Sequence, residues 1–361
     1  MPLFHSLPSG GGFMSEVGWL AAGGEDVTAQ FHELLPVVEL EHLKAFEVLT
    51  VPGIFTAWYP RYFAAIEIGL RPLRVRRSRV DTEGTVEDNA GILASEIRAP
   101  TIVVAQSKGP LDVHAALWMY PSAARNVRAF VSLQGCFSGT PLASDARRTR
   151  LWRAAVGGVT RLLGSTPRAY WDMTYERRQA LLARIPQHSP VPTVSLVTVC
   201  ARAGPLLERT RRYLLDVHRV ESDGFVPAPD ALIPGSRIVR LSGLDHAALA
   251  LPWWSGTPVN PAPIVRALVV LAAGSMRHHD VSQALFFPAR PLRGIRAPFL
   301  RALFRPMAIA CLRDLTRCLP ERMWCISVRT ERLPFAELFE RRGIGDLLSL
   351  ENHHGSLGWQ T

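Results

Sequence analysis

Short runs rich in β-branched residues alternate with helical patterns from residue 46 to residue 241, and this alternation strongly constrains the fold. The runs are FEVLTV, PLRVRRSRV, TIVVAQ, RAFVSLQ, TVSLVTVC and RIVRL. Strands that alternate with helices predict a mainly parallel β-sheet with helices on both faces. The sequence therefore predicts an α/β fold, in which the polar run RVRRSRV lies near an edge of the sheet.

The pattern changes along the chain and divides it into regions. We expect residues 1–45 to form an N-terminal extension, residues 46–285 the α/β domain, and residues 286–361 an Arg- and Pro-rich tail of unknown role. Residues 142–190 separate RAFVSLQ from TVSLVTVC by far more than a crossover needs, and they carry helical periodicity. This insertion predicts either a helical cap over one end of the sheet or a pair of peripheral core helices.

Composition excludes several classes of protein. The net charge is +10, but the basic residues, nearly all of them arginines, are scattered rather than clustered, so we expect no nucleic-acid partner. The five cysteines and the histidine doublets lack the spacing of metal ligands, so we expect no metal and no cofactor. Residues 1–13 lack the segments of a secretory signal, and no apolar run is long enough to span a membrane. We therefore expect a cytoplasmic protein.

Ser107 stands at the junction between the run TIVVAQ and a helical segment. The stretch AQSKG, residues 105–109, matches the strand–turn–helix pattern G-x-S-x-G, with Ala105 in place of the first glycine. Small residues two positions before and after the serine avoid collisions with the neighbouring strand and helix, and Pro110 suits the first turn of a helix. The pattern predicts that Ser107 is an exposed nucleophile on a strained turn.

A serine nucleophile needs a base and a carboxylate that orients the base. In this architecture the acid follows the serine along the chain and the histidine comes last. His246 directly follows the run RIVRL and its short exit, which makes it the expected base. Asp223 and Asp230 are both candidates for the acid, and we favour Asp223 because Gly224 allows a tight turn; Asp245 is expected to be structural.

Backbone N–H groups are needed to stabilise a developing oxyanion. Lys108, the residue after the nucleophile, supplies one of them. The second is expected from Ile54 or Phe55, because Pro52-Gly53 forms a turn after an early strand. A plain apolar turn remains an alternative there, and the side chain of Lys108 is expected at the surface.

Taken together, these motifs resemble those of the α/β-hydrolase superfamily, and within it those of bacterial lipase- and esterase-type members. The matching segments are PGIF (52–55), QSKG (106–109), SLQ (132–134) with GTPLA (139–143), and DGFVP (223–227) with DH (245–246). The resemblance covers residues 46–255. It implies Ser107 as nucleophile, Asp223 as acid and His246 as base, with a helical cap inserted after the sixth strand.

The resemblance further implies a serine hydrolase that cleaves carboxylic esters through an acyl-enzyme, acting on a small-molecule ester or a lipid with transient contact to a lipid surface. Phe137, Trp152 and Trp171 are expected to line an apolar acyl pocket, although the same aromatics would suit an ordinary core. An acyltransferase or thioesterase on the same triad is an alternative. A catalytically silent binding protein is another, although the chain retains all three triad residue types.

Overall fold

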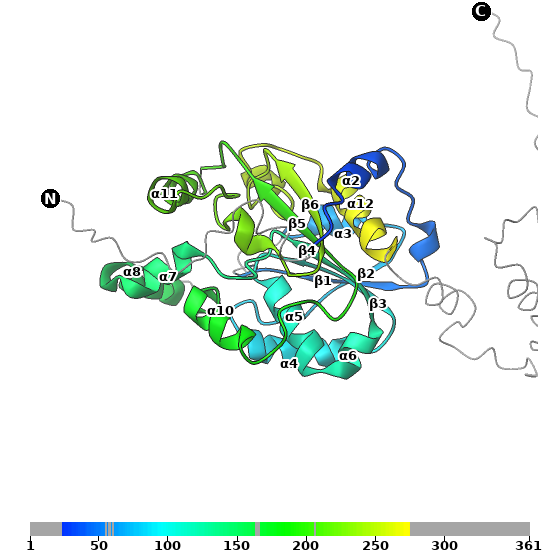
Figure 1. The fold of residues 1–361 in the computed structure, drawn as a ribbon, viewed down its shortest axis with the longest axis horizontal. Coiled ribbons are helices and arrows are strands. Elements are labelled where there is room, and N and C mark those ends of the chain that lie inside the picture. Colours follow the sequence, from blue (N-terminus) through cyan, green and yellow to red (C-terminus); the bar gives the residue numbers. More distant parts are fainter. Residues whose placement is uncertain are drawn as a thin grey trace, which may run out of the picture. The chain divides into compact units, whose positions relative to one another are not determined.

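The computed structural model describes residues 24–54, 56, 59, 61–162, 167–205 and 207–274. Within these residues, six parallel strands form one sheet in the order β2-β1-β3-β4-β5-β6 (Figure 1). The strands are β1 (Glu47–Val51), β2 (Arg74–Arg77), β3 (Thr101–Gln106), β4 (Val127–Leu133), β5 (Thr193–Val199) and β6 (Arg237–Ser242). Each predicted run therefore contributes a strand, and the predicted α/β class is confirmed.

Helices cover both faces of the sheet, as the alternating pattern predicts (Figure 1). The helices on one face are α4 (Val86–Glu96), α5 (Gly109–Met119) and α6 (Pro121–Asn126). The helices on the other face are α2 (Thr28–Leu34), α3 (Ala64–Gly69) and α12 (Pro261–Gly274).

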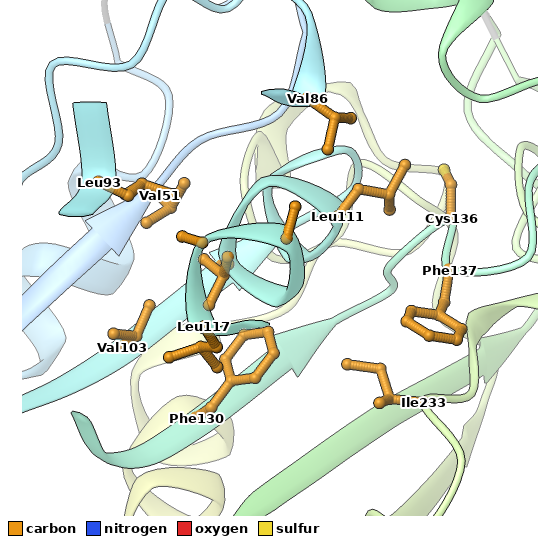
Figure 2. Close-up of a cluster of buried hydrophobic side chains, with 14 of the residues drawn as sticks. Val51, Val86, Leu93, Val103, Leu111, Leu117, Phe130, Cys136, Phe137 and Ile233 are labelled. Carbon is orange, nitrogen blue, oxygen red and sulfur yellow. The ribbon is translucent and has the colours of Figure 1, made fainter. Parts of the chain in front are cut away.

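Each central strand divides its side chains between two apolar cores. In β3, Val103 and Ala105 belong to the core beneath α4 and α5, whereas Ile102 and Val104 belong to the core beneath α3 and α12. Figure 2 shows the first core, in which side chains of α4 and α5 meet those of the strands. Full burial of an aliphatic side chain contributes about 1.5–3 kcal/mol, and burial on both faces explains why the central strands are continuously apolar in sequence.

The two edge strands of the described sheet have different surroundings. β2 is the arginine-rich strand, and its edge position is the one predicted. Arg76 pairs with Glu47 and Arg77 pairs with Glu67, each at 2.7 Å. On β6, the N–H of Val27 donates to the carbonyl of Ile238 at 2.8 Å, so a short N-terminal segment covers that edge.

Residues 24–45 are part of the domain rather than an extension of it. Phe31 of α2 is fully buried in the core beneath α3 and α12, and a 3₁₀ turn, η1 (Glu41–Leu43), buries Leu43 in the same core. We expected the extension to reach residue 45. The apolar face of the helical stretch instead finds a place against β6 and α12, which removes it from water.

The insertion between β4 and β5 forms four short helices. They are α7 (Pro141–Arg148), α8 (Arg150–Leu162), α9 (Arg168–Trp171) and α10 (Tyr175–Leu182). α7 packs against the other three and against α11 (Glu208–His218). The predicted position of the insertion, after a sixth strand, was wrong, because the insertion follows β4, the fourth strand along the described chain.

Residues 275–361 lie outside the described part of the chain, so a tail from residue 286 stays a prediction. None of the described helices combines the length and the hydropathy that crossing a bilayer requires. The cytoplasmic location also stays a prediction.

Candidate active site

Ser107 lies on the turn that connects β3 to α5, as the motif predicts. Its φ angle is 62°, in the left-handed region that residues other than glycine seldom adopt. Gly109 is required here, because a Cβ at this position would lie 2.6 Å from the carbonyl oxygen of Val51. The methyl group of Ala105 is accommodated inside the core. The turn is therefore the strained elbow that holds a serine side chain away from its strand.

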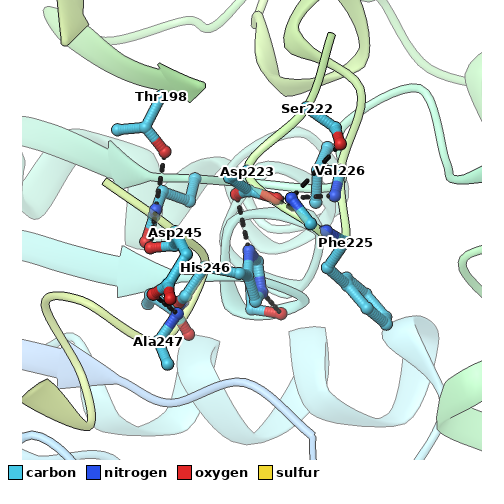
Figure 3. Close-up of polar contacts among 12 residues, drawn as sticks. Thr198, Ser222, Asp223, Phe225, Val226, Asp245, His246 and Ala247 are labelled. Atoms are coloured by element: carbon cyan, nitrogen blue, oxygen red, sulfur yellow. Dashed lines mark hydrogen bonds and ion pairs between the residues drawn. The ribbon is translucent and has the colours of Figure 1, made fainter. Parts of the chain in front are cut away.

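His246 connects the hydroxyl of Ser107 to a carboxylate. Its Nε2 lies 2.9 Å from Ser107 Oγ, and its Nδ1 lies 2.7 Å from Asp223 Oδ2. Figure 3 shows the imidazole of His246 beside the Asp223 carboxylate. The structure thus brings together three side chains from separate loops, after β3, after α11 and after β6, in the hydrogen-bond sequence carboxylate, imidazole, hydroxyl.

The carboxylate of Asp223 is fixed by the turn that carries it. Its Oδ1 accepts hydrogen bonds from the N–H groups of Phe225 and Val226, at 2.9 and 2.8 Å. Gly224 has a φ of 95°, the conformation for which glycine was expected at this position. With Oδ1 held by the backbone, Oδ2 is left to face His246 (Figure 3).

The other two candidate aspartates have different partners. Asp230 lies in the 3₁₀ turn η3 (Ala228–Ala231), where its Oδ2 accepts the hydroxyl of Tyr175 at 2.6 Å. Burial raises the pKa of Asp230 to about 7. The Asp245 carboxylate accepts N–H groups from Gly204, Ala247 and Gly256, which is the structural role expected for it.

The loop that carries His246 is held by backbone and amide contacts. The N–H of His246 donates to the carbonyl of Asp223 at 2.8 Å. Gln134, which follows β4, donates from Nε2 to the carbonyl of Asp245 at 2.9 Å, and Gln106 donates from Nε2 to the carbonyl of His246 at 3.1 Å. The backbone position of His246 is therefore held by several hydrogen bonds that do not involve the nucleophile.

Two backbone N–H groups are available near Ser107. The amides of Lys108 and Ile54 make no hydrogen bond within the described residues. The loop after β1 packs closely against the elbow at Gly53, where a Cβ would lie 2.8 Å from the Cβ of Ser107. Phe55, the other expected donor, lies outside the described residues.

The Lys108 side chain is buried, contrary to our expectation of a surface ammonium. It is 1% exposed, and its Nζ lies 2.6 Å from Asp112 Oδ1, one helical turn further along α5. The second oxygen of Asp112 accepts Nδ2 of Asn89 at 2.9 Å. A charged side chain can enter the core here because a carboxylate with its own hydrogen-bond partner is already there.

A cavity of about 200 Å³ opens beside Ser107 and His246. Among the described residues of its lining, the titratable side chains are His246, Tyr59 and Tyr62. The lining consists of Ile54, Tyr59, Tyr62, Gln106, Ser107, Leu207, Phe225, His246, Ala247, Ala250, Leu251 and Trp254. The cavity is an apolar site with a few polar groups, the usual character of a small-molecule pocket.

Three expected pocket residues lie elsewhere. Phe137 is fully buried in the core near Ile233 (Figure 2), with its ring 4.9 Å from that of His114. Trp152 is 64% exposed on α8, and Trp171 packs edge-on against Tyr170 on α9. Assigning these aromatics to the pocket was wrong, because none of the three is among the described residues that line the cavity.

The aromatic residues that do line the cavity come from loops and from a 3₁₀ turn, η4 (Pro252–Trp254). Tyr59 and Trp254 meet edge to face, with ring centroids 5.5 Å apart, and the ring of Phe225 lies 5.0 Å from that of His246. Phe225 is the one with a sequence signal, since it follows Asp223 in the DGFVP segment. Tyr59, Tyr62 and Trp254 carry no signal in the sequence that marks them as neighbours of the nucleophile.

A larger hollow, of about 440 Å³, lies on the insertion between α7 and α10. It is lined mostly by charged side chains, of which Arg148 pairs with Glu176 and Arg177 with Glu87. No nucleophile–base pair lies in it. In the described part of the chain, no group of three or more His, Cys, Asp or Glu side chains is arranged to hold a metal ion.

Comparison with solved structures shows which fold this is. The crystal structure of a metagenomic carboxyl esterase, MGS0156, superposes with a TM-score of 0.55 at 20% sequence identity, over 73% of this chain and 94% of that one. The chain has the α/β-hydrolase fold.

Two further structures of this fold are similar at lower scores. The mature lipase BlEst2 of Bacillus licheniformis has a TM-score of 0.46 at 20% identity, over 55% of this chain and 84% of that one. Lipase 1 of Pelosinus fermentans has a TM-score of 0.47 at 12% identity, over 63% and 98%. No protein-family model and no curated protein sequence matches the chain.

Proposed function

We propose that this α/β-hydrolase-fold protein is a carboxylic ester hydrolase that works through an acyl-enzyme on Ser107. The observation that carries the proposal is the hydrogen-bond sequence from Asp223 through His246 to Ser107, with distances of 2.7 and 2.9 Å, at the wall of an apolar cavity. Nucleophile, base and orienting acid are the parts that acyl transfer to serine requires. The carboxyl esterase of similar fold supports the same reaction class.

In the acylation half, Ser107 Oγ forms a bond to the ester carbonyl carbon while its proton passes to His246 Nε2. The carbonyl electron pair moves onto oxygen, where the N–H groups of Lys108 and Ile54 stabilise the negative charge. The intermediate collapses by breaking the bond to the alkoxide, which takes the proton from His246. Asp223 keeps the proton of the neutral imidazole on Nδ1 and stabilises the imidazolium that forms.

In the deacylation half, His246 takes a proton from water as the water oxygen attacks the acyl carbon. The second intermediate breaks its bond to Ser107 Oγ, which recovers the proton from His246, and the carboxylic acid leaves. The apolar lining supports an uncharged acyl group, because a buried charge would find no described partner there other than His246.

Labelling with a fluorophosphonate probe tests the proposal. We expect the wild-type protein to be labelled and Ser107→Ala to be unlabelled. Ser95→Ala is the matched control, because Ser95 is an exposed serine on α4. Persistent labelling of folded Ser107→Ala, or no labelling of folded wild type, contradicts the proposal and favours a silent binding protein.

A panel of substrates then separates the reaction classes. Hydrolysis of p-nitrophenyl esters with acyl chains of increasing length supports the esterase assignment. Thioester analogues and added alcohol acceptors identify a thioesterase or an acyltransferase by product analysis. Contact with a lipid surface stays a prediction.

A further inference from the structure

Tyr62 connects the loop after β1 to the elbow strand. Its hydroxyl accepts the N–H of Gly53 at 3.4 Å and donates to Oε1 of Gln106. Gly53 directly precedes Ile54, whose amide is one of the two expected oxyanion donors. The ring of Tyr62 is buried, and its backbone N–H donates to the carbonyl of Tyr59 at 2.8 Å. The hydroxyl is therefore held at a defined place beside the oxyanion loop, residues 52–54.

Gln106 continues this connection to the other side of the site. It is the last residue of β3 and it immediately precedes Ser107. Its Oε1 accepts from Tyr62, and its Nε2 donates to the carbonyl of His246 at 3.1 Å. One buried amide thus contacts both loops that flank the nucleophile. The orientation of the amide is determined, because its oxygen faces a donor and its nitrogen faces an acceptor.

We propose that Tyr62 and Gln106 are positioning residues that hold the oxyanion loop and the histidine loop in register on either side of Ser107. The inference rests on the proposed function, because it assigns these residues to the same reaction. Neither side chain takes part in bond making. They act through the backbone of Gly53 and of His246, whose positions decide where the Ile54 amide and the imidazole lie.

The chemistry of the two side chains suits this role. Burial raises the pKa of the Tyr62 hydroxyl, so it remains a protonated donor to Gln106 throughout the neutral range. Misplacing a reacting group by about 1 Å costs on the order of 10²-fold in rate, and losing one oxyanion donor costs about 10²–10³-fold. A buried link that fixes both loops therefore affects kcat rather than substrate affinity.

Tyr62→Phe removes the hydroxyl and keeps the ring. We expect kcat for a p-nitrophenyl ester to fall by about 10- to 100-fold with KM changed less than about 3-fold, because the defect appears at the transition state. Tyr175→Phe is the matched control, since it also removes a tyrosine hydroxyl that donates to a side-chain oxygen, but Tyr175 is not among the described residues that line the cavity. A Tyr62→Phe variant that matches Tyr175→Phe in kcat overturns the proposal.

Gln106→Met breaks the same link from its other end and provides a second variant if Tyr62→Phe fails to fold. Because both substitutions remove one shared connection, we expect their effects on kcat to be less than additive in the double variant. Fully additive effects, or a Gln106→Met variant with wild-type kcat, overturn the proposal. Thermal unfolding of each variant separates lost positioning from lost structure.

Hydrogen exchange at the Gly53 amide gives a readout that does not depend on catalysis. We expect faster exchange at Gly53 in Tyr62→Phe than in wild type, and no change in Tyr175→Phe. Unchanged exchange in Tyr62→Phe overturns the link. If folded wild type is not labelled by the fluorophosphonate, the proposed function fails, and exchange at Gly53 still decides whether the link holds the loop.

Discussion

Two buried acid–base pairs flank Ser107, and their surroundings are opposite. Asp223 and His246 lie on the cavity side, where the His246 side chain is 12% exposed and its Nε2 faces the serine hydroxyl. Asp112 and Lys108 lie on the core side, where both side chains are sealed from water at a separation of 2.6 Å. The two pairs have almost the same separation between nitrogen and carboxylate oxygen, since His246 Nδ1 and Asp223 Oδ2 are 2.7 Å apart.

The difference shows what a buried acid–base pair needs in order to transfer a proton. His246 has a second nitrogen, and that nitrogen has a hydroxyl and an open cavity beside it, so a proton can be passed on. Lys108 finds its one described partner in Asp112, and Asn89 occupies the other oxygen of Asp112. Burial raises the pKa of Asp112 to about 6, with the charge of Lys108 opposing the rise. This pair can hold the start of α5 but has no route for a proton to leave.

The largest expected effect is on the cavity-side pair. Asp223→Asn keeps the shape of the turn but removes the charge and the acceptor that sets the imidazole tautomer. We expect kcat to fall by about 10⁴-fold with little change in thermal stability. Asp230→Asn is the matched control, because Asp230 faces Tyr175 rather than His246. Loss of activity in the Asp230 variant with retention in the Asp223 variant would reverse the assignment of the acid.

The core-side pair is expected to affect stability instead. Asp112→Asn leaves the ammonium of Lys108 buried without a counter-charge, so the free energy of unfolding should fall by about 3–5 kcal/mol. Urea unfolding measures the loss. Fluorophosphonate titration counts the active sites, and the rate of ester hydrolysis per active site should be close to wild type.

The double variant Lys108→Met/Asp112→Leu sharpens this comparison. Replacing both charges with apolar groups should recover most of the lost stability, because the desolvation cost disappears together with the attraction. A double variant as unstable as Asp112→Asn would show that the pair contributes to the core in some way other than charge compensation.

His114 extends the comparison to a buried base without an acid partner. Burial, together with the charge of Arg178, lowers the pKa of His114 to about 4. Between pH 6.5 and pH 4 the unfolded chain binds a proton at His114 that the folded chain does not, so stability is lost as the pH falls through this range.

His114→Gln should remove the part of the pH-dependent loss of stability that comes from His114. Relative to the variant, wild type should lose up to about 3 kcal/mol of unfolding free energy between pH 6.5 and pH 4. Urea unfolding at several pH values in this range measures the difference. Parallel pH profiles for the two proteins would mean that His114 takes up its proton equally in both states.

The smallest effect is expected for an ion pair at the surface. Arg148 and Glu176 lie 2.5 Å apart on the insertion, and both side chains are about half exposed. Water screens this pair, so Glu176→Gln should change the free energy of unfolding by less than about 0.5 kcal/mol. A loss comparable to that of Asp112→Asn would mean that burial is not what separates the two kinds of pair.

The sheet and the three triad positions could be predicted because their signals are local. A β-branched run marks a strand wherever it packs, and Ser107 lies within one five-residue motif. His246 follows from its place directly after a predicted strand, since the carboxyl ends of parallel strands meet at one edge of a sheet. Asp223 follows from the tight turn that Gly224 allows in the loop before His246.

The pocket could not be predicted, because it forms where separate loops meet. Tyr59, Leu207 and Trp254 lie far apart along the chain, and nothing in their own neighbourhoods shows that they face one cavity. The prediction for Phe137 was wrong for a related reason. An apolar side chain suits a pocket wall and a closed core equally well, so its residue type does not distinguish the two. For Lys108 a signal did exist, since Asp112 follows it at the spacing of one helical turn.

The treatment of the sheet edges has a consequence for the behaviour of the protein at high concentration. An uncovered strand edge is a template on which a second molecule can add its own strand and begin to aggregate. On β2 the charged side chains make the addition of a further strand unfavourable, and on β6 the segment around Val27 already takes up the hydrogen bonds of Ile238. Both edges of the described sheet are thus protected against intermolecular strand addition, one by charged side chains and the other by occupancy at Ile238.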